Sequence, residues 1–325
     1  MKRVFTALLV LGLSSGAWAT ENLLNVSYDV SREFYKDYDQ AYVQHHGGGL
    51  TVQQSHGGSS AQARAVAEGL EADVVTLNQE TDLDFLASKG VLAPDWQHEF
   101  PHASAPFSST IVFLVRKGNP KGLKDWADLL HPGVQVVVPN PKTSGNGRYS
   151  YLAAWAWAAK QPGGSDASAR RFVQGLFHNV PVLDTGGRAA TTTFAQHGIG
   201  DVLLTFENEA LLSQKELGAD RFDVVYPSAS IDAELPVAVA TRYASKHGTV
   251  ALAHDYLNYL YSAPAQELAA AHYLRPLDPA VLQQHADLFR PIRRYTVQEV
   301  FGSWAQAQKS HFADGGIFDQ IYQPH

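Results

Sequence analysis

The chain has 325 residues, a formal net charge of −7 at pH 7 and no cysteine. An acidic balance without any block of basic residues argues against a nucleic-acid partner, and a chain without cysteine forms no disulfide bonds. Hydrophobic residues make up 45% of the sequence, which is enough for two domains with cores of ordinary size.

The amino terminus has the pattern of a secretory signal peptide. Basic residues at positions 2 and 3 precede an apolar run at positions 4–13, and the tripeptide Ala17-Trp18-Ala19 matches the small-residue pattern of a cleavage site. The apolar run is too short to span a membrane, and no later stretch is apolar enough to do so. We therefore expect residues 1–19 to be a signal peptide that is cleaved after Ala19, and the mature protein to be periplasmic.

The predicted mature chain contains no sulfur, because the only methionine is Met1. Leucine replaces methionine in cores at little cost, so this composition can be incidental. It can also reflect synthesis when sulfur is scarce, which would indicate a role in sulfur acquisition. Composition does not separate these two interpretations. If expression of the protein does not respond to the sulfur supply, the second interpretation is disfavoured.

Patterns typical of strands and of helices alternate along most of the chain. This alternation favours an α/β fold with mostly parallel sheets. In chain order, strands are predicted at 23–28, 50–54, 73–77, 110–116, 134–138, 180–183, 201–206, 223–226 and 235–240. Helices are predicted at 30–45, 61–69, 83–89, 123–130, 147–160, 167–177, 189–197, 249–261 and 265–272.

Two stretches of this pattern, 104–117 and about 227–240, look like connections between two lobes. A chain that leaves one α/β lobe, builds a second and returns leaves a cleft between them, where small ligands tend to bind. The predicted boundaries are 20–108 plus 237–325 for lobe I and 109–236 for lobe II.

A short polar or glycine-rich turn joins a strand to a helix at four places. The first N–H groups of a helix have no partners within it, and the helix dipole adds partial positive charge there, so such turns suit an oxyanion. Parallel strands place successive helix starts along one edge of a sheet, and the turns should therefore converge. Each turn alone is also explained as an ordinary helix cap. The turns are Asn25–Asp29, Gln54–Ser59, Thr143–Gly147 and Asp184–Gly187.

These turns and several other segments resemble the periplasmic sulfate- and thiosulfate-binding proteins of ABC importers. The similar segments follow one another in order over nearly the whole mature chain. They are NVSYD at 25–29, QSHGGS at 54–59, STIVFLVRKGNP at 109–120, NPKTSGN at 140–146, YLAAW at 151–155, DTGGR at 184–188, DVLL at 201–204 and FGSW at 301–304. The resemblance implies a type II periplasmic binding protein, with two lobes, two or three crossovers and a dehydrated sulfate held between the lobes.

The resemblance also implies which residues bind the anion. Ser144 would donate its hydroxyl, and the other ligand residues would donate backbone N–H groups. A site made only of donors accepts unprotonated sulfate but offers no acceptor for the proton of hydrogen phosphate. Carried over position by position, the ligand residues are Asp29, Ser59, Ser144, Gly145, Asn146 and Gly187.

One position departs from the sulfate-specific pattern. Members specific for sulfate carry a tryptophan, whose indole N–H donates to the anion, where this chain has Phe206. Phenylalanine cannot donate, and the thiosulfate-type members resemble this chain there. We expect Phe206 to be a cleft contact and both anions to bind. Sulfate should bind more weakly than in a tryptophan-bearing site, by about 0.5–1.5 kcal/mol.

Arg32, Arg148 and Arg188 each lie within one turn of a proposed ligand residue. They are either direct clamps on the anion or outer partners of nearby carboxylates. The resemblance favours the outer role, because a bidentate clamp would also raise the affinity for phosphate. The carboxylate of Asp29 must then turn away from the anion or be balanced by a cation.

Other functions remain as alternatives. Molybdate or phosphate could occupy the same kind of site. The pair His45-His46 with His56 suggests a metal site, but glycines follow the pair, and no cysteine or carboxylate stands at ligand spacing. Glu207 and Glu209 could form a carboxylate pair, but their stretch is more typical of a cleft wall or a partner contact.

A hydrolase is the least favoured alternative. Ser59, Ser144 and Asp184 near His56 suggest a nucleophile with its base, but the chain has no G-x-S-x-G elbow and the serines stand at caps. We therefore expect no enzymatic activity, no metal and no cofactor. The expected partners are sulfate or thiosulfate and a membrane ABC permease, and the protein is expected to be a monomer.

Overall fold

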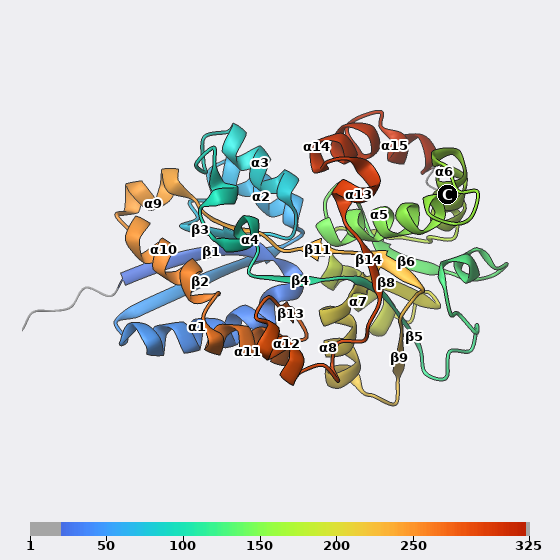
Figure 1. Cartoon of the computed structure of the whole chain (residues 1–325), viewed down its shortest axis with the longest axis horizontal. Helices are drawn as coiled ribbons and strands as arrows, with labels where there is room; N and C mark the ends of the chain where they lie inside the picture. The colour runs from blue at the N-terminus through green and yellow to red at the C-terminus, as the bar shows by residue number, and fades with distance from the viewer. Residues whose placement is uncertain (1–20, 323–325) are drawn as a thin grey trace, which may run out of the picture.

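The computed structural model describes residues 21–322, so the predicted signal peptide and its cleavage site lie outside the described residues. The described chain forms two halves side by side, each a sheet with helices packed on it (Figure 1). This is the predicted two-lobed α/β architecture. Within residues 21–322, no helix is long and apolar enough to cross a membrane.

The first lobe contains a four-stranded sheet of order β12-β3-β1-β2. β1 pairs in parallel with β2 and β3, and β12 joins β3 in the antiparallel sense from a distant part of the chain. Its strands are β1 (Glu21–Tyr28), β2 (Leu50–Gly57), β3 (Val74–Thr76) and β12 (Val237–Val239). Its helices are α1 (Arg32–His46), α2 (Ser59–Ala67), α3 (Glu80–Ser88), α9 (Thr241–His247), α10 (Val250–Tyr259) and α11 (Ala263–Ala271).

The second lobe contains a five-stranded sheet of order β7-β6-β8-β5-β9. β6 is parallel to β7 and β8, whereas β5 is antiparallel to β8 and β9. Its strands are β5 (Ile111–Arg116), β6 (Val136–Pro139), β7 (Leu183–Asp184), β8 (Val202–Phe206) and β9 (Phe222–Val225). Its helices are α5 (Gly145–Ala159), α6 (Asp166–His178), α7 (Gly187–Ala195) and α8 (Glu207–Leu217).

Helix α5 is buried on nearly all sides, which explains its alanine- and tryptophan-rich sequence. It contacts α6, strands of the second sheet and β10 (Ala229–Ile231), and only Trp157 and Ala159 near its end are partly exposed. A helix held this firmly gives its first residue, Gly145, a fixed position.

The chain passes between the lobes three times (Figure 1). The first two passes lie in the predicted connections, and the third leads from α12 (Pro279–Gln284) to β14 (Arg293–Tyr295). A small sheet of order β11-β4-β13 lies at the crossing. Its strands are β4 (Phe107–Ser109), β11 (Ala233–Glu234) and β13 (Arg275–Pro276).

The end of the described chain lies beside the second lobe (Figure 1). β14 pairs with β10, α15 contacts α6, and Tyr151 on α5 hydrogen-bonds His311 at 2.9 Å; α14 also touches α3. The predicted boundaries assign residues 237–325 to the first lobe, and these contacts do not favour that assignment beyond residue 293. The terminal helices are α13 (Val297–Phe301), α14 (Trp304–Ala307), the π-helical turn η4 (Gln308–Phe312) and α15 (Ile317–Ile321).

Three local predictions differ from the structure. The strand expected at 180–183 is only the two-residue β7, which begins at Leu183. The helix expected at 123–130 is only a 3₁₀ helix, η3 (Trp126–Leu130), because Asp125 forms a capping box that starts the helix late. Helix α8 is not predicted, because strand β8 leads into it without a turn residue and Phe206 provides no side-chain cap. The remaining short helical segments are η1 (Asp29–Ser31), η2 (Trp96–His98) and α4 (Pro101–Ser104).

Candidate anion-binding site

The four predicted turns meet where the lobes touch. A Cβ atom placed on Gly58, in the first lobe, would come within 2.6 Å of the Thr143 carbonyl oxygen and 2.7 Å of the Thr185 carbonyl oxygen in the second lobe. A Cβ on Gly186 would come within 2.3 Å of Asp29 Oδ2. Only glycine allows backbones to approach this closely, so the turns hold their glycines for steric reasons.

Three helices begin at this meeting point with unused N–H groups. α2 starts at Ser59, α5 at Gly145 and α7 at Gly187, and neither α2 nor α7 has a side-chain cap. Within residues 21–322, no acceptor pairs with the N–H groups of Ser59, Gly145, Asn146 or Gly187. These four residues are buried. Unpaired buried N–H groups are rare in proteins, and they make this place suitable for an anion.

Ser144 is the N-cap of α5. Its Oγ accepts a hydrogen bond from the Gly147 N–H at 3.4 Å, which leaves its own hydroxyl proton available to a ligand. The Asn146 side chain is used elsewhere, since its Nδ2 donates to Thr205 Oγ1 at 2.9 Å. The backbone N–H of Asn146 has no such partner in the described part of the chain and is open to an anion.

The carboxylate of Asp29 points toward the start of α7. Its Oδ2 accepts a hydrogen bond from the Arg188 N–H at 2.9 Å, and the residue is only 8% exposed. Burial raises the pKa of Asp29, and the hydrogen bond and charge of Arg188 oppose that rise. The carboxylate thus takes up the Arg188 N–H at the amino terminus of α7 and lies near the positive charge of the Arg188 side chain.

Arg188 and Arg148 bind carboxylates. Arg188 makes a two-pronged contact with Glu33, at 2.6 and 3.0 Å, and a third contact with Glu209 at 3.2 Å. Arg148 lies 3.6 Å from Asp82. These pairings leave few donors for a direct clamp and favour the outer role for both arginines.

The two arginine pairs also join the lobes. Arg188 extends from α7 to Glu33 on α1, and Arg148 extends from α5 to Asp82 on α3. The third arginine named from the sequence, Arg32, is exposed at the start of α1.

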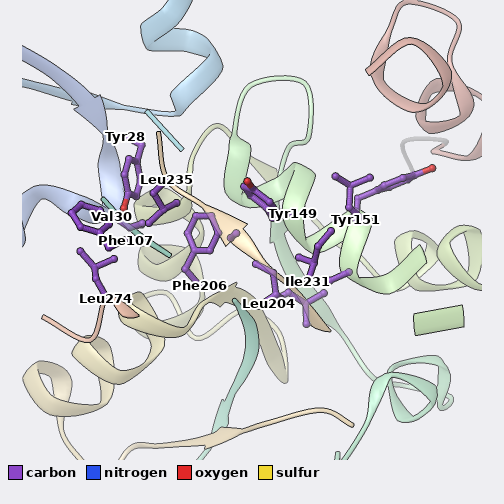
Figure 2. Close-up of a cluster of buried hydrophobic side chains, with 14 of the residues drawn as sticks. Tyr28, Val30, Phe107, Tyr149, Tyr151, Leu204, Phe206, Ile231, Leu235 and Leu274 are labelled. Carbon is purple, nitrogen blue, oxygen red and sulfur yellow. The ribbon is translucent and has the colours of Figure 1, made fainter. Parts of the chain in front are cut away.

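Phe206 lies at the end of β8 inside an aromatic cluster (Figure 2). Its ring centroid is 6.3 Å from that of Tyr28 in the first lobe and 5.7 Å from that of Tyr149 in the second, both with edge-to-face geometry. The side chain is fully buried. Contact between Phe206 and an anion remains a prediction, but the ring offers an apolar wall.

His56 carries no positive charge at neutral pH. Burial lowers its pKa to about 4, and the nearby positive charge of Arg32 acts in the same direction. Its Nδ1 is 2.7 Å from Ser27 Oγ, and His46 pairs with Glu21. Among residues 21–322, no group of three His, Cys, Asp or Glu side chains is arranged to hold a metal.

The sequence does not single out several residues that the structure places here. Glu33 and Asp82 are partners of the arginines, and such partners are fixed by packing across the lobes. Glu209, which the sequence offered as a carboxylate pair with Glu207, instead pairs with Arg188, and Glu207 pairs with Arg275. Asn78 is different, because it follows β3 and precedes α3 as the fifth strand–turn–helix junction. Its local pattern could have been recognised in the same way as the other four.

Known proteins resemble this chain closely. Residues 24–275 match the bacterial extracellular solute-binding protein family, and the chain belongs to that family. Within it, the chain is 57% identical to the thiosulfate-binding protein of Pseudomonas aeruginosa over 100% of both chains. It is 51% identical to the sulfate-binding protein of Salmonella typhimurium over 92% of each chain. The solved structure of the sulfate-binding protein SubI from Mycobacterium tuberculosis matches with a TM-score of 0.83 at 32% identity, covering 89% of this chain and 98% of that chain.

Proposed function

We propose that this protein captures sulfate and thiosulfate outside the cytoplasm and delivers them to a membrane ABC permease, without performing chemistry. The main support is the set of unpaired N–H groups at three helix starts that meet between the lobes. The names of the relatives, which are sulfate- and thiosulfate-binding proteins, point to the same two anions.

Neutral donors can hold a buried dianion. Aligned peptide dipoles and helix amino termini supply the opposing partial charge, so no cation has to touch the ligand. Hydrogen phosphate would bring a proton to a set of proposed ligand groups that are all donors, and this disfavours it. The ligand residues in this proposal are Asp29, Ser59, Ser144, Gly145, Asn146 and Gly187.

The ring of Phe206 supports binding of thiosulfate beside sulfate. The terminal sulfur of thiosulfate is larger than oxygen and a poorer acceptor, so an apolar ring facing it removes less hydrogen bonding than it would from sulfate. The difference between the two anions should correspond to one neutral hydrogen bond, about 0.5–1.5 kcal/mol.

Closure of the lobes would be the signal to the permease. The arginine pairs Arg188–Glu33 and Arg148–Asp82 join the lobes and would stabilise a closed form. An anion that binds the closed form more tightly than the open form shifts the population toward closure. The proposal includes export through the signal peptide, cleavage after Ala19 and action as a periplasmic monomer.

Calorimetric titration of the dialysed mature protein with sulfate, thiosulfate, phosphate and molybdate tests the function. We expect heat of binding with both sulfur anions and none with phosphate. The ratio of the sulfate and thiosulfate affinities measures the influence of the Phe206 position. If neither sulfur anion gives heat of binding, or if phosphate binds equally well, the proposed ligand is excluded.

Ser144→Ala is expected to weaken sulfate binding by about 1 kcal/mol, because one neutral hydrogen-bond donor is lost. The same change removes the cap of α5, which should lower the free energy of unfolding by about 1 kcal/mol. Ser165→Ala is the matched control, since Ser165 caps α6 on the exposed surface. The control should lose stability and keep its affinity, and equal affinity in both variants would show that the Ser144 hydroxyl does not touch the anion.

A further inference from the structure

Asn78 lies between proposed donors from the two lobes. Its backbone N–H donates to Ser59 Oγ in the first lobe at 3.3 Å. Its side chain lies against Gly145 in the second lobe, because a Cβ placed on that glycine would come within 1.7 Å of Asn78 Oδ1 and 3.1 Å of Nδ2. The amide group therefore borders the place where α2 and α5 begin.

The side-chain amide of Asn78 is buried without a partner. The residue is 2% exposed, and its Oδ1 makes no hydrogen bond within residues 21–322. In the same described part of the chain, no hydrogen bond joins Nδ2 to another residue. Most buried polar side chains are hydrogen-bonded, and one that is not calls for an explanation. An unprotonated oxyanion carries only acceptors, so it can supply a partner for Nδ2 but not for Oδ1.

We propose that the side-chain amide of Asn78 is a further ligand of the bound anion and donates an Nδ2–H hydrogen bond to it. This inference rests on the proposed function. The last torsion of asparagine is soft and roughly two-fold, so a half-turn exchanges oxygen and nitrogen with little displacement. The amide nitrogen attracts an oxyanion, whereas the oxygen would repel it.

Charged groups on the neighbouring elements already have partners. Asp82 on α3 accepts hydrogen bonds from Ser59 Oγ at 2.6 Å and pairs with Arg148 on α5. Glu80 at the start of α3 interacts with the Gln97 side chain. Gln79 Oε1 is also buried without a partner within residues 21–322, but that atom is an acceptor, and Gln79 Nε2 already donates to Ser60 Oγ and Asp82 Oδ2. The Asn78 amide can instead present Nδ2 to a ligand, and as a neutral donor it preserves the selection against protonated anions.

Two substitutions at Asn78 test the proposal by titration with sulfate, thiosulfate and phosphate. Asn78→Leu keeps the size of the side chain and removes the donor. We expect it to weaken binding of both sulfur anions about 5-fold, the same loss of one neutral donor that is expected for Ser144→Ala. Asn258→Leu, at an exposed position of α10, is the matched control and should bind like the unmodified protein.

Asn78→Asp separates contact with the anion from packing between the lobes. A carboxylate facing the anion should lower the affinity for sulfate by about 1,000-fold or more at pH 8. At pH 5 the carboxyl group takes up a proton, so part of the affinity should return. The same variant should gain affinity for phosphate relative to sulfate, because it adds an acceptor. A residue that only packs against Gly145 would produce neither effect.

The outcomes distinguish this inference from the proposed function. If the unmodified protein binds sulfate or thiosulfate and Asn78→Leu binds equally well, Asn78 is not a ligand while the function stands. A loss in Asn78→Asp that is the same at pH 5 and pH 8, with no relative gain for phosphate, also overturns the inference. If the unmodified protein binds neither sulfur anion, the proposed function itself fails. Thermal unfolding of each ligand-free variant checks that it is folded.

Discussion

Gly145→Asp is expected to abolish binding of sulfate and thiosulfate. The new carboxylate would stand at the start of α5, next to the proposed anion. Two unit charges 4 Å apart repel by about 4 kcal/mol at an effective dielectric of about 20, which corresponds to about 1,000-fold in affinity. The new Cβ would also lie 1.7 Å from Asn78 Oδ1, so the lobes could not close without displacing that side chain.

Calorimetry measures this loss, and two further variants separate its causes. Gly145→Ala adds the collision without the charge and should weaken binding less. Gly175→Asp adds the charge on α6, where a Cβ meets only the Leu130 methyl groups at 3.2 and 3.6 Å, and should leave affinity unchanged. Undiminished affinity in Gly145→Asp would mean that the start of α5 is not at the anion.

Arg188→Ala is expected to lower the free energy of unfolding by about 3 kcal/mol, because it leaves Glu209 buried without its cation. The Glu209 side chain is 1% exposed and that of Arg188 is 31% exposed, so the pair is partly screened and the lower end of the usual range applies. Thr191 Oγ1 continues to donate to Glu209 at 2.7 Å in the variant, which reduces the loss of free energy of unfolding. Urea unfolding of the ligand-free protein measures the effect.

The decrease in the free energy of unfolding caused by Arg188→Ala should depend on pH. Burial raises the pKa of Glu209 to about 7, against the opposing charge of Arg188, and removing the arginine raises the pKa of Glu209 further. A carboxyl group whose pKa is higher in the folded than in the unfolded state destabilises the fold increasingly as pH rises between the two values. The deficit should therefore be largest at pH 8 and smaller at pH 5.

Matched variants test whether this pH dependence comes from Glu209. Arg293→Ala breaks an exposed pair with Glu299 and should cost less than about 1 kcal/mol at either pH. Adding Glu209→Gln to Arg188→Ala should recover most of the loss at pH 8. An equal deficit at pH 5 and pH 8 would contradict the assignment to Glu209.

Local sequence patterns predicted how the backbone of the candidate site is arranged. The four predicted turns each join a strand to a helix, and parallel strands bring such turns together. They are Asn25–Asp29, Gln54–Ser59, Thr143–Gly147 and Asp184–Gly187. The alternation of strands and helices likewise predicted the two-lobed α/β fold, and the motifs predicted the family.

Features that depend on contacts between distant segments were not predictable in this way. The pairing of Arg188 with Glu33 and Glu209 joins three helices, and no local pattern shows it. The position of the last helices beside α5 and α6 depends on a third pass between the lobes, which leaves only a short strand, β14, as a signal. Helix α8 lacks the start signal on which its recognition depends.

The repeated passage of the chain between the lobes also sets an order for folding. The first sheet lacks an edge strand until Val237–Val239 has been synthesised, after the whole second sheet, and β4 lacks one partner until Arg275–Pro276 follows. Contacts between such distant segments are slow to form, because a long loop must close first. The amino-terminal lobe therefore remains incomplete on the ribosome while most of the chain emerges. A continuous fragment that ends before the second sheet therefore lacks one edge strand of the first sheet.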